Sequence, residues 1–294
     1  MKVEPATIET MASKASELNS SLPRVLIRPS RGWVSLNLRE LWAYRELGMF
    51  FVWRDLKVRY KQTVFGVVWA VIQPLLLVFV FSLFLGRFAS LAPTGIPYPL
   101  FAFAGLVPWM LFSKSLVGAA DSLLGASNLI QKVYFPRLLL PISALGSHVF
   151  DFILGFGVLL VMMLYFGISP QVSLVWIVPM GILTLITSLA AGVWLSAANV
   201  RYRDVRQLVP FIVQLWLFAS PVIYTADLVP ADWLWLYRLN PMSGVIEGFR
   251  WAVLGQGSAP PLDALLVSAG VTSLVLMSGV LYFRRVERTF ADVI

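Results

Sequence analysis

Long apolar segments constrain this chain more than any other feature of its sequence. We place six of them, at residues 66–86, 98–120, 138–166, 172–198, 207–226 and 262–283. A helix needs about 20 predominantly apolar residues to cross the hydrocarbon core of a membrane. Charged residues make up only 13% of the chain, against about 25% in soluble domains. We therefore expect an all-α integral membrane protein with six transmembrane helices.

The lysines and arginines are concentrated on one side of this arrangement. They lie mainly before the first apolar segment, in the connections after the second and fourth segments, and in the C-terminal tail. Connections rich in Lys and Arg remain in the cytoplasm. The distribution therefore predicts that both termini are cytoplasmic. It also argues against nucleic-acid binding, because the cations flank apolar segments and do not form one basic face.

The polar N-terminal region divides into two parts. Residues 1–32 lack periodicity, and we expect them to form a mobile cytoplasmic tail. Residues 33–64 are expected to form an amphipathic helix at the membrane surface, because apolar residues recur at helical spacing. That apolar stripe consists of Leu38, Leu41, Trp42, Met49, Trp53, Leu56 and Tyr60. The six-helix domain then covers residues 65–294.

The segment at residues 227–260 is too rich in polar residues and proline to span a membrane, yet it carries many aromatic residues. Asn240 and Pro241 divide it, since a helix seldom continues through the residue before a proline. Gly244 and Gly248 have the four-residue spacing that lets helices approach closely. We expect two short re-entrant helices that enter the membrane from its outer face.

The sequence contains little that could carry out a reaction or couple transport to an ion gradient. It has no cysteine and one histidine, so thiolate and multi-histidine metal sites are excluded. No G-x-x-x-x-G-K-[ST] motif occurs, so we expect no nucleotide cofactor on this chain. Ionisable residues inside the apolar segments include Lys114, His148 and Asp151. His148 and Asp151 share a helix face, and they form either a local polar pair or part of a proton relay.

Five stretches, in this order, resemble the membrane subunit of type-2 ABC exporters of the polysaccharide and polyol-phosphate branch. They are residues 53–75, 128–141 (NLIQKVYFPRLLLP), 201–224, 239–250 and 283–294. The resemblance implies a homodimer that works with two copies of a separate ATPase, which binds ATP and magnesium. It also implies export of an undecaprenyl-pyrophosphate-linked polysaccharide, foremost O-antigen, across the bacterial inner membrane. Capsule, teichoic acid and hydrophobic drugs are alternative cargoes, and an ion-coupled carrier is a competing interpretation.

The resemblance also implies a coupling helix within residues 122–137 that docks on the ATPase. Lys132 and Arg137 would pair with acidic groups there. Tyr134 and Phe135 would supply buried contact. The complete docking set is Asn128, Gln131, Lys132, Tyr134, Phe135, Pro136 and Arg137.

The interface helix would lie beside the substrate entrance. Its candidate residues are Arg54, Asp55, Arg59 and Tyr60. The arginines suit the pyrophosphate of a lipid-linked substrate. An equally weighted alternative is that they anchor the helix to lipid head groups.

Two further sets belong to the transport pathway. Sugar rings present apolar C–H faces that stack on aromatic side chains, so we expect four aromatic residues to line the channel: Phe211, Trp216, Phe218 and Tyr224. An outer gate would involve Asn240, Pro241, Glu247 and Arg250. Glu247 and Arg250 are three residues apart, and the spacing predicts an ion pair within one helix. The sequence leaves open which glycan is exported.

Overall fold

The computed structural model describes residues 38–61, 66–84, 95–202, 204–255, 260–287 and 290. Over these residues the chain is helical and contains no β-strand, which confirms the predicted all-α class. The predicted tail at residues 1–32 and the start of the interface helix lie outside the described residues.

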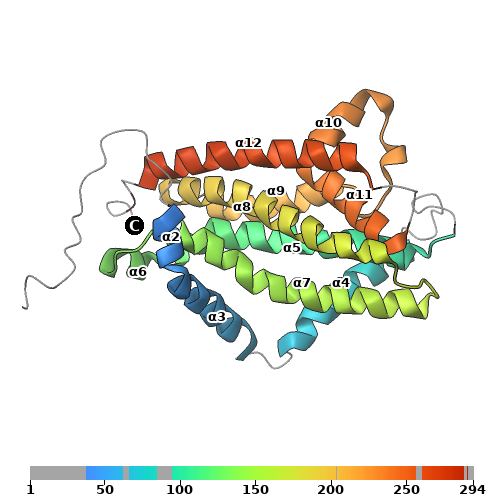
Figure 1. Cartoon of the computed structure of the whole chain (residues 1–294), viewed down its shortest axis with the longest axis horizontal. Coiled ribbons are helices and arrows are strands. Elements are labelled where there is room, and N and C mark those ends of the chain that lie inside the picture. The colour runs from blue at the N-terminus through green and yellow to red at the C-terminus, as the bar shows by residue number, and fades with distance from the viewer. Residues whose placement is uncertain are drawn as a thin grey trace, which may run out of the picture. The chain divides into compact units, whose positions relative to one another are not determined.

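The helices follow the chain in the order drawn in Figure 1. They are α2 (Leu38–Ala43), α3 (Arg45–Lys61), α4 (Gly66–Phe84), α5 (Tyr98–Gly125), α6 (Ser127–Lys132), α7 (Leu139–Tyr165), α8 (Ile177–Arg201), α9 (Val205–Phe218), α10 (Leu234–Leu239), α11 (Pro241–Leu254) and α12 (Leu262–Glu287). Short 3-10 helices, η1 (Val172–Trp176), η2 (Ala226–Leu228) and η3 (Ala231–Trp233), lie in the connections before α8 and α10.

Four helical stretches of the described chain are long and apolar enough to cross a membrane. They are Tyr98–Gly125, Leu139–Tyr165, Val172–Arg201 and Leu262–Glu287. The other two predicted segments correspond to shorter apolar helices, Val68–Phe84 and Val205–Phe218. Helix α9 stops at Phe218, before Pro221, because proline has no amide hydrogen to continue a helix. Membrane crossing by α4 and α9 therefore stays a prediction.

Helix α5 lies at the centre of the bundle. It packs against α7, α8 and α11, and α12 runs alongside α8 (Figure 1). Phe103 and Phe112 of α5 and Phe249 of α11 are completely buried in the main apolar core. The stretch Leu100–Trp109 of α5 is apolar on all sides, which favours such a position.

Helices α10 and α11 correspond to the two short helices predicted from the sequence. They meet at Asn240, whose side chain accepts a hydrogen bond from the Met242 amide at 3.1 Å. A Cβ atom on Gly244 would lie 2.4 Å from the Ala264 carbonyl oxygen of α12. One on Gly248 would lie 2.8 Å from Met180 of α8. The close helix approach that the glycine spacing predicts is confirmed.

The interface helix differs from its prediction in two ways. It is interrupted at Tyr44, between α2 and α3. The single apolar stripe is not observed either, because apolar side chains lie on more than one face of α3. Phe51 is buried against the bundle, whereas Met49 and Trp53 are 69% and 55% exposed. Helix α3 thus packs one face against α7 and presents another to its surroundings.

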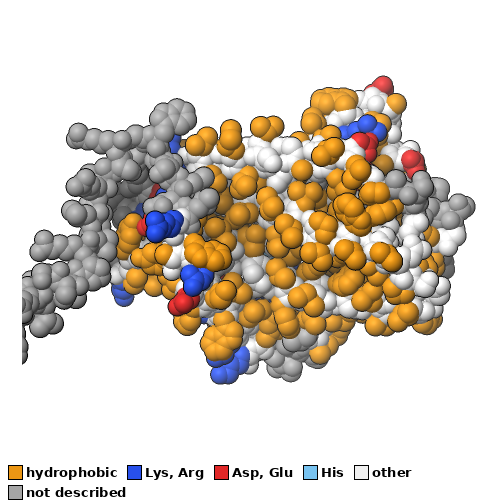
Figure 2. Space-filling model, viewed as in Figure 1, with side chains coloured by type: hydrophobic (Ala, Val, Ile, Leu, Met, Phe, Trp, Pro, Cys, Tyr) orange, Lys and Arg blue, Asp and Glu red, His pale blue; other side chains and the backbone are white. Residues whose placement is uncertain are grey.

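The surface pattern agrees with a membrane environment. In Figure 2, hydrophobic side chains cover the middle of the visible face, while most charged side chains lie toward its ends and over α2 and α3. Charged side chains are costly in the hydrocarbon core and are tolerated at its borders.

Candidate functional site

The predicted coupling segment contains a shorter helix than expected. Helix α6 ends at Lys132, and Val133 has extended backbone angles. Six residues form the helix, and the next stretch leads to α7 without regular structure. The side chains of Asn128, Gln131, Lys132 and Tyr134 are exposed at this end of the bundle. These four residues are available to a partner.

Three other residues of the predicted docking set are occupied within the chain. Phe135 is 4% exposed and contacts the Phe51 ring edge-on, with the ring centroids 5.9 Å apart. Arg137 donates a hydrogen bond to the Glu287 carbonyl oxygen at the end of α12. Pro136 is buried. The expectation that Phe135 faces the ATPase is therefore wrong, whereas docking by the partly exposed Arg137 stays a prediction. The aromatic side chain completes the apolar cluster under α3, and the arginine binds the last turn of α12.

Tyr134 contacts the N-terminal helix instead of the core. Its hydroxyl donates a hydrogen bond to the Glu40 carboxylate of α2 at 3.3 Å, and both groups are at the surface. The exposed part of the docking segment and α2 therefore lie next to each other.

The predicted entrance residues separate into two groups on α3. Arg54 and Asp55 form an ion pair with each other at 2.8 Å, and both are partly exposed. Arg59 and Tyr60, one turn further on, point into the bundle and contact α7. Only the second pair belongs to a partly buried polar site.

That polar site is centred on the Asp151 carboxylate of α7. Its Oδ2 atom accepts hydrogen bonds from Arg59 Nη1 at 3.2 Å and from Lys114 Nζ of α5 at 3.3 Å. Its Oδ1 atom accepts a hydrogen bond from the Tyr60 hydroxyl. Arg59 Nη1 also lies 3.1 Å from His148 Nδ1. One carboxylate thus binds two cations from two different helices. We call Asp151 together with Arg59, Tyr60, Lys114 and His148 the Asp151 cluster.

The groups around the Asp151 cluster keep the Tyr60 hydroxyl protonated and leave space for the His148 ring. Burial, followed by the hydrogen bond and charge of Asp151, raises the pKa of the Tyr60 hydroxyl, so Tyr60 remains a donor. The His148 side chain is buried against Gly118 of α5. A Cβ atom on Gly118 would lie 2.8 Å from His148 Nε2, so only glycine leaves room for the imidazole.

A cleft of about 540 Å³ opens beside the Asp151 cluster. Its walls come from α3, α4, α5, α7 and α9, and it is lined by Arg59, Lys114 and His148 among others. Gln73 and Ser113 add polar groups. The sequence interpretation treated the entrance residues and the three intramembrane residues as separate sets, and the structure brings them together.

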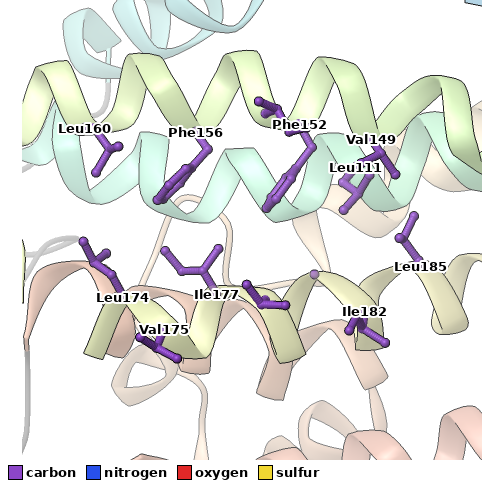
Figure 3. Close-up of a pocket in the computed structure, with 13 residues that line it drawn as sticks. Leu111, Val149, Phe152, Phe156, Leu160, Leu174, Val175, Ile177, Ile182 and Leu185 are labelled. Atoms are coloured by element: carbon purple, nitrogen blue, oxygen red, sulfur yellow. The ribbon is translucent and has the colours of Figure 1, made fainter. Parts of the chain in front are cut away.

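A second cavity, of about 510 Å³, is apolar. Figure 3 shows Val149, Phe152 and Phe156 of α7 pointing toward Ile177 and Leu185 of α8 across this groove. Its lining is almost entirely hydrocarbon. It offers apolar contact but no polar group that could orient a charged ligand.

The predicted channel aromatics do not face one surface. Phe211 and Phe218 of α9 are 59% and 56% exposed. Trp216 turns inward, where it contacts the Phe112 ring and donates a hydrogen bond to the Asn240 side chain at 3.1 Å. Tyr224 donates to the Phe218 carbonyl oxygen at 3.1 Å. Phe211 and Phe218 are therefore accessible, while Trp216 and Tyr224 hold the end of α9 in place.

Asn240 joins this end of α9 to α11. Its amide nitrogen donates to the Ala219 carbonyl oxygen at 3.2 Å and to the Ser220 hydroxyl at 2.9 Å. Its oxygen caps α11, and Pro241 begins that helix, a position that proline favours.

Arg250 does not form the predicted ion pair with Glu247. Its guanidinium donates to the Val222 carbonyl oxygen at 2.6 Å and to the Tyr224 carbonyl oxygen at 3.1 Å. It also lies 3.7 Å from the centroid of the Phe101 ring. The prediction failed because α11 is buried, so that Arg250 points toward α5 and away from its neighbour on the same helix.

Glu247 has a different partner. The Tyr237 hydroxyl of α10 donates to its carboxylate at 2.7 Å. Burial raises the pKa of the Glu247 carboxyl, and this hydrogen bond partly offsets the effect. The two residues fasten α10 to α11.

With this geometry established, comparison with known proteins identifies the family. A family model described as ABC-2 type transporter matches residues 47–254. The chain belongs to the ABC-2 type transporter family. The match runs from α3 through α11, so it includes the coupling segment, the Asp151 cluster and the Arg250 contacts.

Relatives within this ABC-2 group have names that refer to polysaccharides. The O-antigen export system permease protein RfbA of Myxococcus xanthus is 30% identical over 258 residues, which cover 87% of this chain and 98% of the relative. RfbA of Klebsiella pneumoniae is 27% identical over 244 residues, which cover 82% and 92%. The polysialic acid transport protein KpsM of Escherichia coli is 24% identical over 215 residues, which cover 68% and 78%.

Sequence interpretation missed several contacts of this ABC-2 chain. Lys114 was given no partner within the chain, yet it binds Asp151. Gly105 was not singled out, although a Cβ atom there would lie 2.7 Å from Arg250 Nη2 and from the Val222 carbonyl oxygen. Charged residues inside a membrane need partners, and this rule could have predicted the contact between Lys114 and Asp151. The contact at Gly105 depends on tertiary packing alone.

Proposed function

We propose that this chain is the membrane-spanning subunit of an ATP-driven exporter of lipid-linked polysaccharide, with O-antigen as the cargo. The observation that carries the proposal is the 30% identity to an O-antigen export permease across 98% of that relative. The all-helical fold with several long apolar helices supports the same role.

Energy would come from a separate ATPase that binds ATP and magnesium. The exposed residues Asn128, Gln131, Lys132 and Tyr134 are the candidate contact surface for it. Tyrosine is enriched at protein interfaces, and an exposed lysine suits a partner surface that carries acidic groups. Two copies of this chain would work with two copies of the ATPase, as the resemblance implies.

The chain would lie in the bacterial inner membrane with both termini in the cytoplasm. The concentration of Lys and Arg in alternate connections supports this orientation. A reporter fused after residue 294 is expected to report a cytoplasmic location, and an extracytoplasmic signal would reverse the proposed topology.

Deletion of the gene tests the function. We expect loss of the surface polysaccharide and accumulation of undecaprenyl-linked glycan inside the cell, with both defects corrected by the intact chain. An unchanged amount of surface glycan would refute the exporter function.

The relation to KpsM favours one alternative cargo, a capsular polysaccharide. The same deletion distinguishes the two cargoes, because capsule and O-antigen are attached to different lipids and migrate differently in gels. Loss of capsule with intact O-antigen would select the alternative.

A further inference from the structure

We propose that the cleft beside the Asp151 cluster binds the pyrophosphate of a lipid-linked substrate, and that Asp151 occupies the binding cations while the cleft is empty. This inference rests on the proposed function, because it takes the substrate class from it. It differs from the sequence expectation, which assigned the pyrophosphate to the two arginines of the interface helix, Arg54 and Arg59.

The charges in the cleft favour an anion. Arg59 and Lys114 both approach the same oxygen of Asp151, at 3.2 and 3.3 Å. The Asp151 carboxylate carries one negative charge, whereas Arg59 and Lys114 together carry two positive charges. Pyrophosphate carries more charge and more acceptor oxygens than a carboxylate, and it can satisfy both cations at once.

The polar groups around the cations provide further donors for phosphate oxygens. Gln73 and Ser113 line the cleft together with Lys114. The volume of about 540 Å³ lies within the range of small-molecule sites, about 300–1,000 Å³. The apolar groove between α7 and α8 has no comparable set of donors.

The location of the cations also argues for a ligand. Lys114 and Asp151 lie within two of the long apolar helices. Ionisable residues inside membrane segments are costly and usually mark a functional pathway. A cluster that served only to join α3 to α7 would need one cation and one carboxylate, and Lys114 comes from a third helix, α5.

Asp151 and the ligand would compete for the same cations. When pyrophosphate binds Arg59 and Lys114, Asp151 loses both ion pairs and keeps the hydrogen bond from Tyr60. Removing the carboxylate should therefore strengthen binding, whereas removing a cation should weaken it. If the cluster only stabilised the fold, removing the carboxylate and removing a cation would not change the affinity for pyrophosphate in opposite directions.

The test measures binding of farnesyl diphosphate, a soluble prenyl pyrophosphate, to the full-length chain in phosphatidylcholine nanodiscs. We expect saturable binding that inorganic pyrophosphate displaces. Arg59→Gln and Lys114→Gln should each weaken binding about tenfold, the effect of one charge-assisted contact. Asp151→Asn should tighten it. Lys57→Gln is the matched control, because Lys57 lies on α3 over the Trp53 ring and outside the cleft.

Each other outcome overturns the proposal. Equal affinity in the wild type and the two cation variants would place the ligand elsewhere. Anionic phosphatidylglycerol is then added to the nanodisc. If it abolishes the binding of farnesyl diphosphate, the site binds the head groups of ordinary membrane lipids. If Asp151→Asn does not fold, the affinity of Arg59→Lys for farnesyl diphosphate is measured instead. We expect it to lie between the affinities of the wild type and of Arg59→Gln.

The two proposals can fail separately. The binding measurement needs neither the ATPase nor a polysaccharide, whereas gene deletion reports export. Loss of surface glycan on deletion with no pyrophosphate binding would reject the site and keep the exporter function.

Discussion

Arg250 carries its charge in the interior of the bundle, where two backbone carbonyl groups and an aromatic ring surround it. Arg250→Ala would leave the Val222 and Tyr224 carbonyl oxygens without this donor. Hydrogen bonds from a charged group contribute about 1.5–3 kcal/mol each. We therefore expect the free energy of unfolding in detergent to fall by about 3 kcal/mol, and export to decrease while membrane insertion continues.

Arg238→Ala is the matched control for this prediction, because Arg238 is exposed on α10. Its effect on the free energy of unfolding should stay within about 0.5 kcal/mol. Normal stability and normal export in Arg250→Ala would contradict the role of this guanidinium in holding residues 222–224.

Gly105 gives an independent test of the same contact. A Cβ atom at this position would lie 2.7 Å from Arg250 Nη2 and from the Val222 carbonyl oxygen. We expect Gly105→Ala to displace the guanidinium and to lower the free energy of unfolding by about 1–3 kcal/mol, as overpacked core positions do. Denaturant titration in detergent measures the change, and an unchanged unfolding midpoint would argue against a tight fit.

At the residue scale, sequence reasoning identified the important residue types but mispaired them. Arg250, Glu247, His148 and Asp151 were all singled out because charge is rare in this chain. The partners were chosen by spacing along one helix. In the structure Arg250 binds carbonyl groups that precede it by more than 20 residues in sequence, and such contacts leave no local pattern.

At the level of helices and connections, the coupling segment contains both exposed residues that are candidates for docking and a buried residue that stabilises the fold. Tyr134→Ala and Lys132→Ala should weaken co-purification with the ATPase without changing thermal stability, because both side chains are exposed. Phe135→Ala should instead lower the free energy of unfolding by about 3–5 kcal/mol, since it empties a buried aromatic site. Trp235→Ala on exposed α10 is the control. ATPase binding unaffected by the Tyr134 and Lys132 substitutions would exclude this docking surface.

Helix α11 depends on glycine at its contact with α12. Gly244→Ala would place a Cβ atom 2.4 Å from the Ala264 carbonyl oxygen. We expect α11 and α12 to separate and the melting temperature of the purified chain to fall. Gly157→Ala on α7 is the control, because nothing lies within 4 Å of a Cβ atom there. Equal melting temperatures for the two variants would mean that this contact is not tight in the membrane.

The elements were more predictable than their contacts. Hydrophobic length located the long apolar helices, and Asn240 with Pro241 located the boundary between α10 and α11. The interface helix was the main error, because a stripe at helical spacing does not tell which face meets protein and which meets lipid. Both environments are apolar, so the stripe that contains Trp53 gave no sign that Phe51, which lies off it, is the buried residue.

The whole molecule is an all-helical chain of the ABC-2 type transporter family that carries several distinct sites. Helices α3 and α6, which carry Arg59 and the exposed part of the coupling segment, lie toward one end of the bundle, and α11, which carries Arg250, lies toward the other (Figure 1). Pairing with a second copy and with an ATPase could not be predicted from periodicity. Those expectations came from resemblance, because surfaces that meet another subunit have no distinctive hydrophobic period.

Transport in proteoliposomes is the direct test of ATP-driven polysaccharide export by this chain. Vesicles would contain the full-length chain with its ATPase, and undecaprenyl-pyrophosphate-linked glycan would be supplied on the side that bears the ATPase. We predict that glycan reaches the opposite side only when ATP, magnesium and both subunits are present. Transport by the chain alone, driven by an ion gradient and abolished by Asp151→Asn, would contradict the account and establish an ion-coupled carrier.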